Sequence, residues 1–174
     1  MIVSVEKLKK YVTTNLSDEV LEEKLQALEL LIRKYTNNNF QNRNIRFKCI
    51  ASSTGLELST PYLKAENTIE ISQSQYNDGV YYITSIEDEN ITLNKALFDE
   101  EDVLITKVEY PFDVRMGVVE MIRWDLNNRD KVGIQSETIS RHSVTYFDMS
   151  HDNTIMGYPI SLLGFLEPYK RARF

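Results

Sequence analysis

Residues 133–147 read GIQSETISRHSVTYF, and the Ser, Thr and β-branched residues of this stretch favour extended backbone. Side chains of a strand alternate between two faces, and neither face of this stretch is apolar. A strand buried within its own domain should have at least one apolar face. We therefore expect one long polar strand, whose backbone donors and acceptors are paired either by water or by another subunit.

Helical periodicity precedes and follows this strand. Apolar residues recur at three- and four-residue steps over residues 5–12, over about twenty residues after Ser17, over a helix opened by Pro111, and over residues 160–166. Ser17 is a favourable N-cap, and the asparagines at 37–39 can take the left-handed conformation that ends a helix. These patterns predict a small helical core.

The hydrophobic period changes to two between residues 42 and 110, where turn signals such as Asp78-Gly79 separate short apolar runs. Strands at this spacing indicate a small antiparallel barrel or sandwich. Cys49 alternates onto an apolar face and is expected to be buried. The strand candidates are IRFKCIA (45–51), GLELST (55–60), TIEIS (68–72), GVYYITSI (79–86), NITLN (90–94) and VLITKVEY (103–110).

Together these patterns predict an α+β fold in three segments. A small helical bundle forms the core from residues 1–41 and 111–174, and an antiparallel β domain, residues 42–110, is inserted into it. A polar extended segment near the C-terminus completes the expected fold.

Composition limits the function. The net charge of −6 over 174 residues argues against a broad basic face for nucleic acid. The single cysteine indicates a reducing compartment, and no apolar run has the ~18 residues of a membrane span. We expect a protein made in the cytoplasm, with no membrane partner.

Catalytic and metal-binding motifs are not found in the sequence. It has no glycine-rich phosphate loop and no HExxH, CxxC or GxSxG pattern. The acidic groups at 87–89 and 99–102 lack the spacing of a calcium loop, and His151 beside Asp148 and Asp152 suggests at most a weak cation site. We therefore predict no catalytic residue, no metal and no cofactor.

The C-terminal residues 169–174, YKRARF, place three cations between two aromatic side chains. They can form a solvated tail that complements the negative end of the preceding helix. They can equally form an arm that inserts its aromatic residues into a partner and pairs its cations with acidic groups. Phosphate binding is a third alternative, although three cations would give only weak affinity.

Three segments in this order resemble the head–tail connector (head-completion, or adaptor) proteins of tailed bacteriophages. The segments are DVRMGVVEMIRWDLNNRD (113–130), GIQSETISRHSVTYF (133–147) and GYPISLLGFLEPYKRARF (157–174). The helical pattern up to Asn39 is similar too, whereas the β segment departs from the compact helical members of that family.

The resemblance implies a virion protein of the phage neck, without enzymatic activity. It implies a ring, dodecameric like the portal, that docks beneath the portal protein and extends the DNA channel. Such a ring provides the platform for the next connector or tail-completion protein, and DNA passes through it without sequence-specific binding. A ring needs heterologous contacts, which a polar strand can supply by strand addition.

Two sets of residues are the candidates for these contacts. The expected ring and portal contact in the polar strand consists of Ser136, Thr138, Arg141, His142 and Tyr146. The expected portal-binding arm consists of Tyr169, Lys170, Arg171, Arg173 and Phe174.

Two other functions stay open. A β-domain module that binds a peptide or polysaccharide predicts a monomer with a ligand groove in residues 42–110. A metal-dependent enzyme would use the carboxylates of residues 99–102, or Asp148 with Asp152.

Overall fold

A computed structural model describes residues 1–129, 136–139, 142–145 and 153–172, with residues 136–139 and 142–145 described by their backbone alone. The chain divides into two compact units. The first unit comprises Met1–Ser4 and Asn39–Tyr110, and the second comprises Val5–Asn38 and Pro111–Phe174. Each unit is described separately below.

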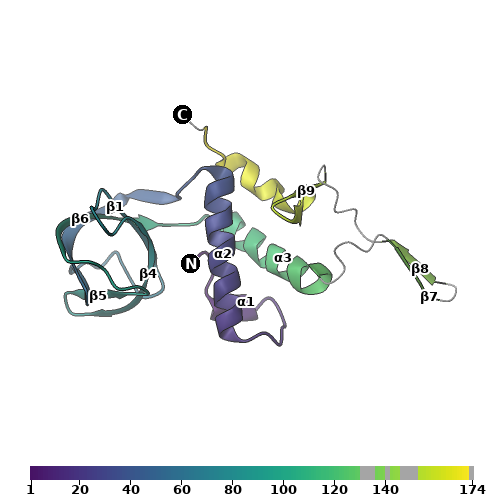
Figure 1. Cartoon of the computed structure of the whole chain (residues 1–174), viewed down its shortest axis with the longest axis horizontal. Helices are drawn as coiled ribbons and strands as arrows, with labels where there is room; N and C mark the ends of the chain where they lie inside the picture. Colours follow the sequence, from purple (N-terminus) through teal and green to yellow (C-terminus); the bar gives the residue numbers. More distant parts are fainter. Residues whose placement is uncertain (130–135, 140–141, 146–152, 173–174) are drawn as a thin grey trace. The chain divides into compact units, whose positions relative to one another are not determined.

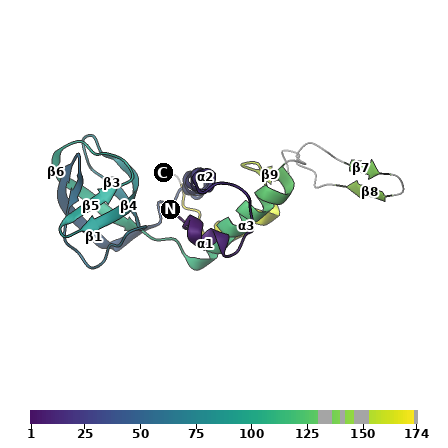
Figure 2. The ribbon, with the colours of Figure 1, turned by 90° about the horizontal axis from the view of Figure 1, so that it is seen from below.

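The first unit is a closed barrel of six antiparallel strands (Figures 1 and 2). Its hydrogen-bonded order is β1-β2-β5-β4-β3-β6, and β6 pairs with β1 to close it. All six strands predicted from the sequence are present. They are β1 (Gln41–Ser52), β2 (Gly55–Glu57), β3 (Thr68–Ser72), β4 (Gly79–Glu87), β5 (Asn90–Leu93) and β6 (Glu100–Val108).

The barrel has its own hydrophobic core. Alternate residues of the strands point inward, so that Ile69, Ile83, Ile91 and Ile105 are almost fully buried. Cys49 lies in the same core, which confirms its expected burial. Burial, and secondarily the charge of Asp102, raises the pKa of its thiol to about 11.

Strand β1 is long enough to curve around the barrel. Its pairing with β6 shifts register between Asn42 and Arg46 and again between Cys49 and Ala51. Such irregularities bend a strand and increase its twist, which a small closed barrel requires.

The second unit contains helices α1 (Val5–Lys9), α2 (Asp18–Thr36) and α3 (Phe112–Asn128) and the 3₁₀ helix η2 (Ile160–Tyr169). Ser17 caps α2 by accepting the N–H of Val20 at 3.4 Å, and Asn37 ends it in the left-handed conformation with φ of 49°, as predicted. No helix of the described residues is long and apolar enough to cross a membrane.

The expected small helical bundle as the core of the fold is wrong, although the fold is of a mixed α and β class. A closed barrel with an independent hydrophobic core dominates one unit. In the other unit, α2 and α3 run in clearly different directions rather than alongside one another as in a bundle (Figures 1 and 2). Hydrophobic periodicity predicts which face of a helix is buried, but it does not predict how two helix axes cross.

The expected single polar strand is also wrong. Strands β7 (Ser136–Ile139) and β8 (His142–Thr145) pair with one another antiparallel, from Ser136 opposite Thr145 to Ile139 opposite His142. A hairpin satisfies half of the backbone groups that one long strand would leave unpaired. Two further short strands, β9 (Thr154–Ile155) and β10 (Tyr158–Pro159), form another two-stranded sheet.

The start of β2, directly after the turn that follows β1, allows a test of how tightly the barrel is packed. Gly55 has a φ of +143°, and a Cβ there would overlap the main-chain carbonyl of Ile91. We predict that Gly55→Ala lowers the free energy of unfolding by about 1–3 kcal/mol, so that a thiol reagent labels Cys49 at least about fivefold faster. Gly164→Ala is the control, because a Cβ at Gly164 meets no atom within 4 Å. Equal labelling rates in the two variants would contradict this account of the turn.

Candidate functional site

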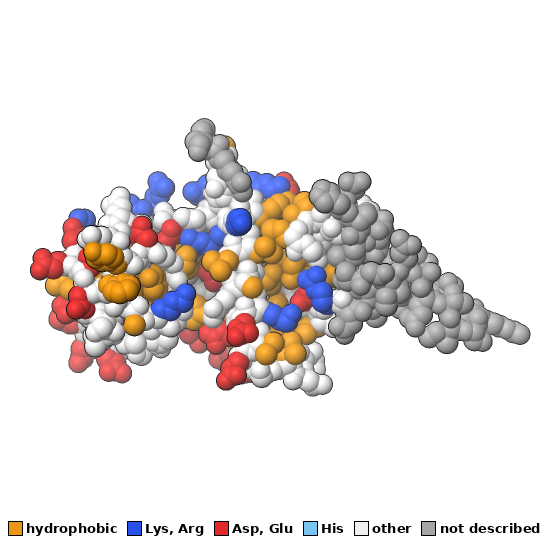
Figure 3. Space-filling view, viewed as in Figure 1, with side chains coloured by type: hydrophobic (Ala, Val, Ile, Leu, Met, Phe, Trp, Pro, Cys, Tyr) orange, Lys and Arg blue, Asp and Glu red, His pale blue; other side chains and the backbone are white. Residues whose placement is uncertain are grey.

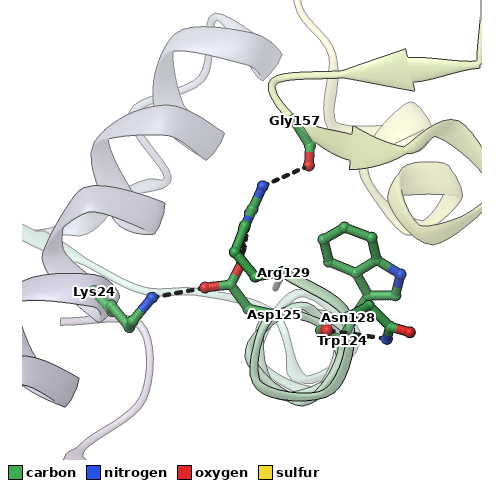
Figure 4. A network of polar contacts seen from close by, with 6 residues as sticks. All are labelled: Lys24, Trp124, Asp125, Asn128, Arg129 and Gly157. Carbon is green, nitrogen blue, oxygen red and sulfur yellow. Dashed lines mark hydrogen bonds and ion pairs between the residues drawn. The ribbon is translucent and has the colours of Figure 1, made fainter. Parts of the chain in front are cut away.

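The polar network around Asp125 connects α2, α3 and the β9–β10 turn (Figure 4). The Asp125 carboxylate is buried, with 6% of its side chain exposed. It accepts a hydrogen bond from Lys24 Nζ at 2.7 Å and another from Arg129 Nε at 2.6 Å. A buried carboxylate needs such charged partners, because desolvation without them costs several kcal/mol.

Arg129 extends this network to the β9–β10 turn. Its Nη1 donates to the carbonyl of Gly157 at 3.0 Å (Figure 4). Its guanidinium lies 5.2 Å from the ring centroid of Trp124 and 5.0 Å from that of Tyr158. These are cation–π distances, so both rings stabilise the guanidinium that pairs with Asp125.

Tyr158 is a buried aromatic residue that packs against Trp124 and Arg129 of the network. It is 6% exposed, and its ring centroid is 5.5 Å from that of Trp124. Burial, followed by the negative charge of Asp125, raises the pKa of Tyr158 to about 12. The carboxylate and the apolar surroundings thus both oppose ionisation of the phenol.

The network fixes both sides of the chain segment that contains the hairpin. Arg129 directly follows α3, Gly157 lies between β9 and β10, and their hydrogen bond joins the two sides. The hairpin β7–β8 lies between these residues in sequence. The α2–α3–β10 framework thus holds the ends of the segment from which an assembly contact is expected.

The C-terminal segment packs against its own unit as far as Ala172. Tyr169 Oη donates to the carboxylate of Asp113 at 2.8 Å, and the Asn38 side chain donates to the carbonyl of Tyr169 at 3.1 Å. Lys170 pairs with Glu167 at 2.7 Å and lies 4.3 Å from the ring centroid of Tyr35. Tyr169 and Lys170 thus position the tail on α2 and α3.

The backbone of the tail continues along the end of α2. The N–H of Arg171 donates to the Thr36 carbonyl at 2.8 Å, and the Asn37 side chain donates to the Ala172 carbonyl at 2.9 Å. The side chain of Arg171 is exposed. Arg173 and Phe174, the last two residues of the expected arm, lie outside the described residues.

Three of the five residues expected to form the ring contact lie on the described strands of the hairpin. Ser136 and Thr138 belong to β7, and His142 begins β8. The register places Thr138 opposite Ser143 and His142 opposite Ile139. Arg141 and Tyr146 lie outside the described residues.

The acidic cluster of residues 99–102 is used within the barrel. Asp99 accepts the N–H of Ser53, Glu100 accepts three donors of the β3–β4 connection, and Asp102 pairs with Lys48 at 2.7 Å. In the part of the chain that the structure describes, no three His, Cys, Asp or Glu side chains could together hold a metal ion. Asp148, His151 and Asp152 lie outside that part.

Sequence reasoning missed the Asp125 network. The signal was present in part, since Asp125 and Arg129 are four residues apart on one helix and Trp124 is the only tryptophan of the chain. The sequence could not identify Lys24 as a partner of Asp125, because the two residues are 101 positions apart. Only the packing of α2 near α3 brings it to the carboxylate.

Comparisons with protein-family models and with curated proteins give no match for this chain.

Removal of the buried carboxylate tests the network. Asp125→Ala leaves Lys24 and Arg129 without their shared anion, and we predict a loss of about 3 kcal/mol in the free energy of unfolding. Trp124 lies in the network, so its fluorescence during urea unfolding reports on this unit specifically.

The matched control is Glu120→Ala, which removes a half-exposed carboxylate of the same helix that pairs with Arg123. We expect a change of less than about 1 kcal/mol there. If both substitutions shift the urea midpoint equally, Asp125 does not stabilise the unit in the way described.

Proposed function

We propose that this protein is a structural head–tail connector of a tailed bacteriophage, which forms a ring beneath the portal and joins the packaged head to the tail. The proposal combines the sequence resemblance over residues 113–174 with one structural observation. Among the described strands, β7 pairs only with β8, so each has an outer edge that no other described strand covers. A hairpin of this size is marginally stable in water, and assembly would complete it.

The register of the hairpin indicates which backbone groups face outward. Two residues separate β7 from β8, and in such a connection the pair beside the turn, Ile139 and His142, exchanges hydrogen bonds. The alternation along an antiparallel ladder then directs the N–H groups of Ser136 and Thr138 outward on β7. Those of Ser143 and Thr145 face outward on β8.

A ring of identical subunits fits these edges. Each subunit of a ring offers one surface and accepts a different one, and strand addition is such a heterologous contact. The hairpin edge would pair with the portal or with the next subunit, in a ring that we expect to be dodecameric. The basic tail would bind the portal through the cations of Arg171 and Arg173, while Tyr169 and Lys170 hold it on its own subunit.

The charge of the chain supports passage of DNA through such a ring. The net charge is −6, and an acidic wall repels phosphate rather than gripping it. Packaged DNA could therefore slide past. The next connector or tail-completion protein would dock on the opposite side of the ring.

Proline substitution on the hairpin edges tests the proposal. Thr138→Pro and Ser143→Pro each remove an outward-facing N–H and add a ring at one edge, while the hydrogen bonds between β7 and β8 are kept. We predict that at least one of them abolishes ring formation on the purified portal protein, as seen by electron microscopy. The variant that forms no ring identifies which strand, β7 or β8, pairs with the neighbouring protein.

Thr138→Ala and Ser143→Ala are the matched controls, because they change the side chain and retain the N–H. They are expected to form rings. Rings that form with both proline variants would exclude strand addition by this hairpin. A wild-type protein that forms no ring on the portal would exclude the connector function itself.

A further inference from the structure

An exposed pair of aromatic side chains lies in the loops at one end of the barrel. Tyr76, in the β3–β4 connection, is 62% exposed, and Phe98, in the β5–β6 connection, is 66% exposed. Their ring centroids are 5.9 Å apart. Two large aromatic rings left in water beside one another are more typical of a contact surface than of a solvated turn.

The two loops are held rigidly in this arrangement. Asn77 is 1% exposed and bonds both main-chain groups of Phe98, accepting its N–H at 2.8 Å and donating to its carbonyl at 3.0 Å. Glu100 accepts hydrogen bonds from Ser74 Oγ at 2.5 Å, from the N–H of Gln75 at 2.8 Å and from Asn77 Nδ2 at 3.1 Å. The rings are therefore positioned before any partner arrives, which lowers the entropic cost of binding.

The two loops that carry the pair are also acidic. Asp78 follows Tyr76 by two residues and Asp99 follows Phe98 directly, and both are exposed. Hydrogen bonds from Ser74 and from the N–H of Gln75 lower the pKa of Glu100 and so favour its negative charge. Figure 3 shows acidic side chains next to exposed hydrophobic ones on the barrel unit.

The charge of the chain is concentrated in this unit. Residues 39–110 carry twelve Asp and Glu against six Lys and Arg, which equals the whole net charge of −6. A cationic partner is therefore favoured at this surface over a neutral or anionic one.

We propose that the loop end of the barrel, formed by Tyr76, Phe98, Asp78 and Asp99, binds an arginine-bearing segment of a partner protein. The two rings are inclined at 55°, so they form an open V rather than the flat platform on which a sugar ring stacks. A guanidinium fits against such rings by cation–π contact and pairs with neighbouring carboxylates at the same time. This site does not depend on the connector proposal, because it uses neither the hairpin nor the tail.

The test uses the full-length protein and the synthetic peptide YKRARF as probe, because this peptide carries two arginines beside aromatic residues. We expect the peptide to shift the amide resonances of residues 74–78 and 98–101 in ¹H–¹⁵N spectra. Phe98→Ala keeps every charge and is expected to raise the Kd about threefold to tenfold, which matches the loss of one cation–π contact.

Tyr62→Ala is the matched control. Tyr62 is 60% exposed and stacks on Phe47, with an angle of 23° between the two rings. It lies between β2 and β3, and thus in neither of the two loops that carry Tyr76 and Phe98. Its loss should leave the Kd unchanged. Thermal unfolding of both variants verifies that each is folded.

Three outcomes would overturn the proposal. The first is an unchanged Kd in Phe98→Ala, which would reduce the binding to general attraction between a cation and an acidic protein. The second is the absence of peptide-induced shifts at residues 74–78 and 98–101. The third is that maltoheptaose, and not the peptide, shifts these residues, which would make the surface a glycan site.

Discussion

The pairing of β1 with β6 is the constraint on which the two-unit organisation depends. It closes the barrel, and it places Gln41, near the start of the barrel, directly opposite Val108 at its end. The chain therefore enters and leaves the barrel at adjacent positions, where the N–H of Glu109 donates to the Phe40 carbonyl at 2.9 Å and the rings of Phe40 and Tyr110 lie 4.9 Å apart. Adjacent ends allow a domain to sit within another sequence without interrupting it.

In the second unit, an ion pair joins the two sides of a segment of the chain. Its β-hairpin segment lies between α3 and the β9–β10 turn, and the ion pair of Asp125 with Arg129 connects the two sides through the Gly157 carbonyl. A buried ion pair is a costly way to gain stability, but it specifies one arrangement of partners. Such a fixed arrangement is what we expect where a segment that contacts another protein must be held in a defined place.

The sequence predicted local structure well and long-range structure poorly. The six barrel strands, the Ser17 cap and the Asn37 terminus all follow from periodicity and residue chemistry, which act over a few residues. The hairpin was missed because Ser140 and Arg141 are not the Asn-Gly or Asp-Gly residues that indicate a two-residue turn. The Asp125 network depends on Lys24 from a distant helix, and the Tyr76–Phe98 pair depends on barrel closure, so neither could be predicted from spacing.

The central claim is that assembly completes the hairpin. Hydrogen exchange of the Ser136–Ile139 and His142–Thr145 amides, measured with and without purified portal protein, tests it most directly. The account predicts that the outward-facing amides of at least one of these strands become protected in the ring, while the barrel core amides exchange as before. Unchanged exchange of both strands within an assembled ring would contradict it.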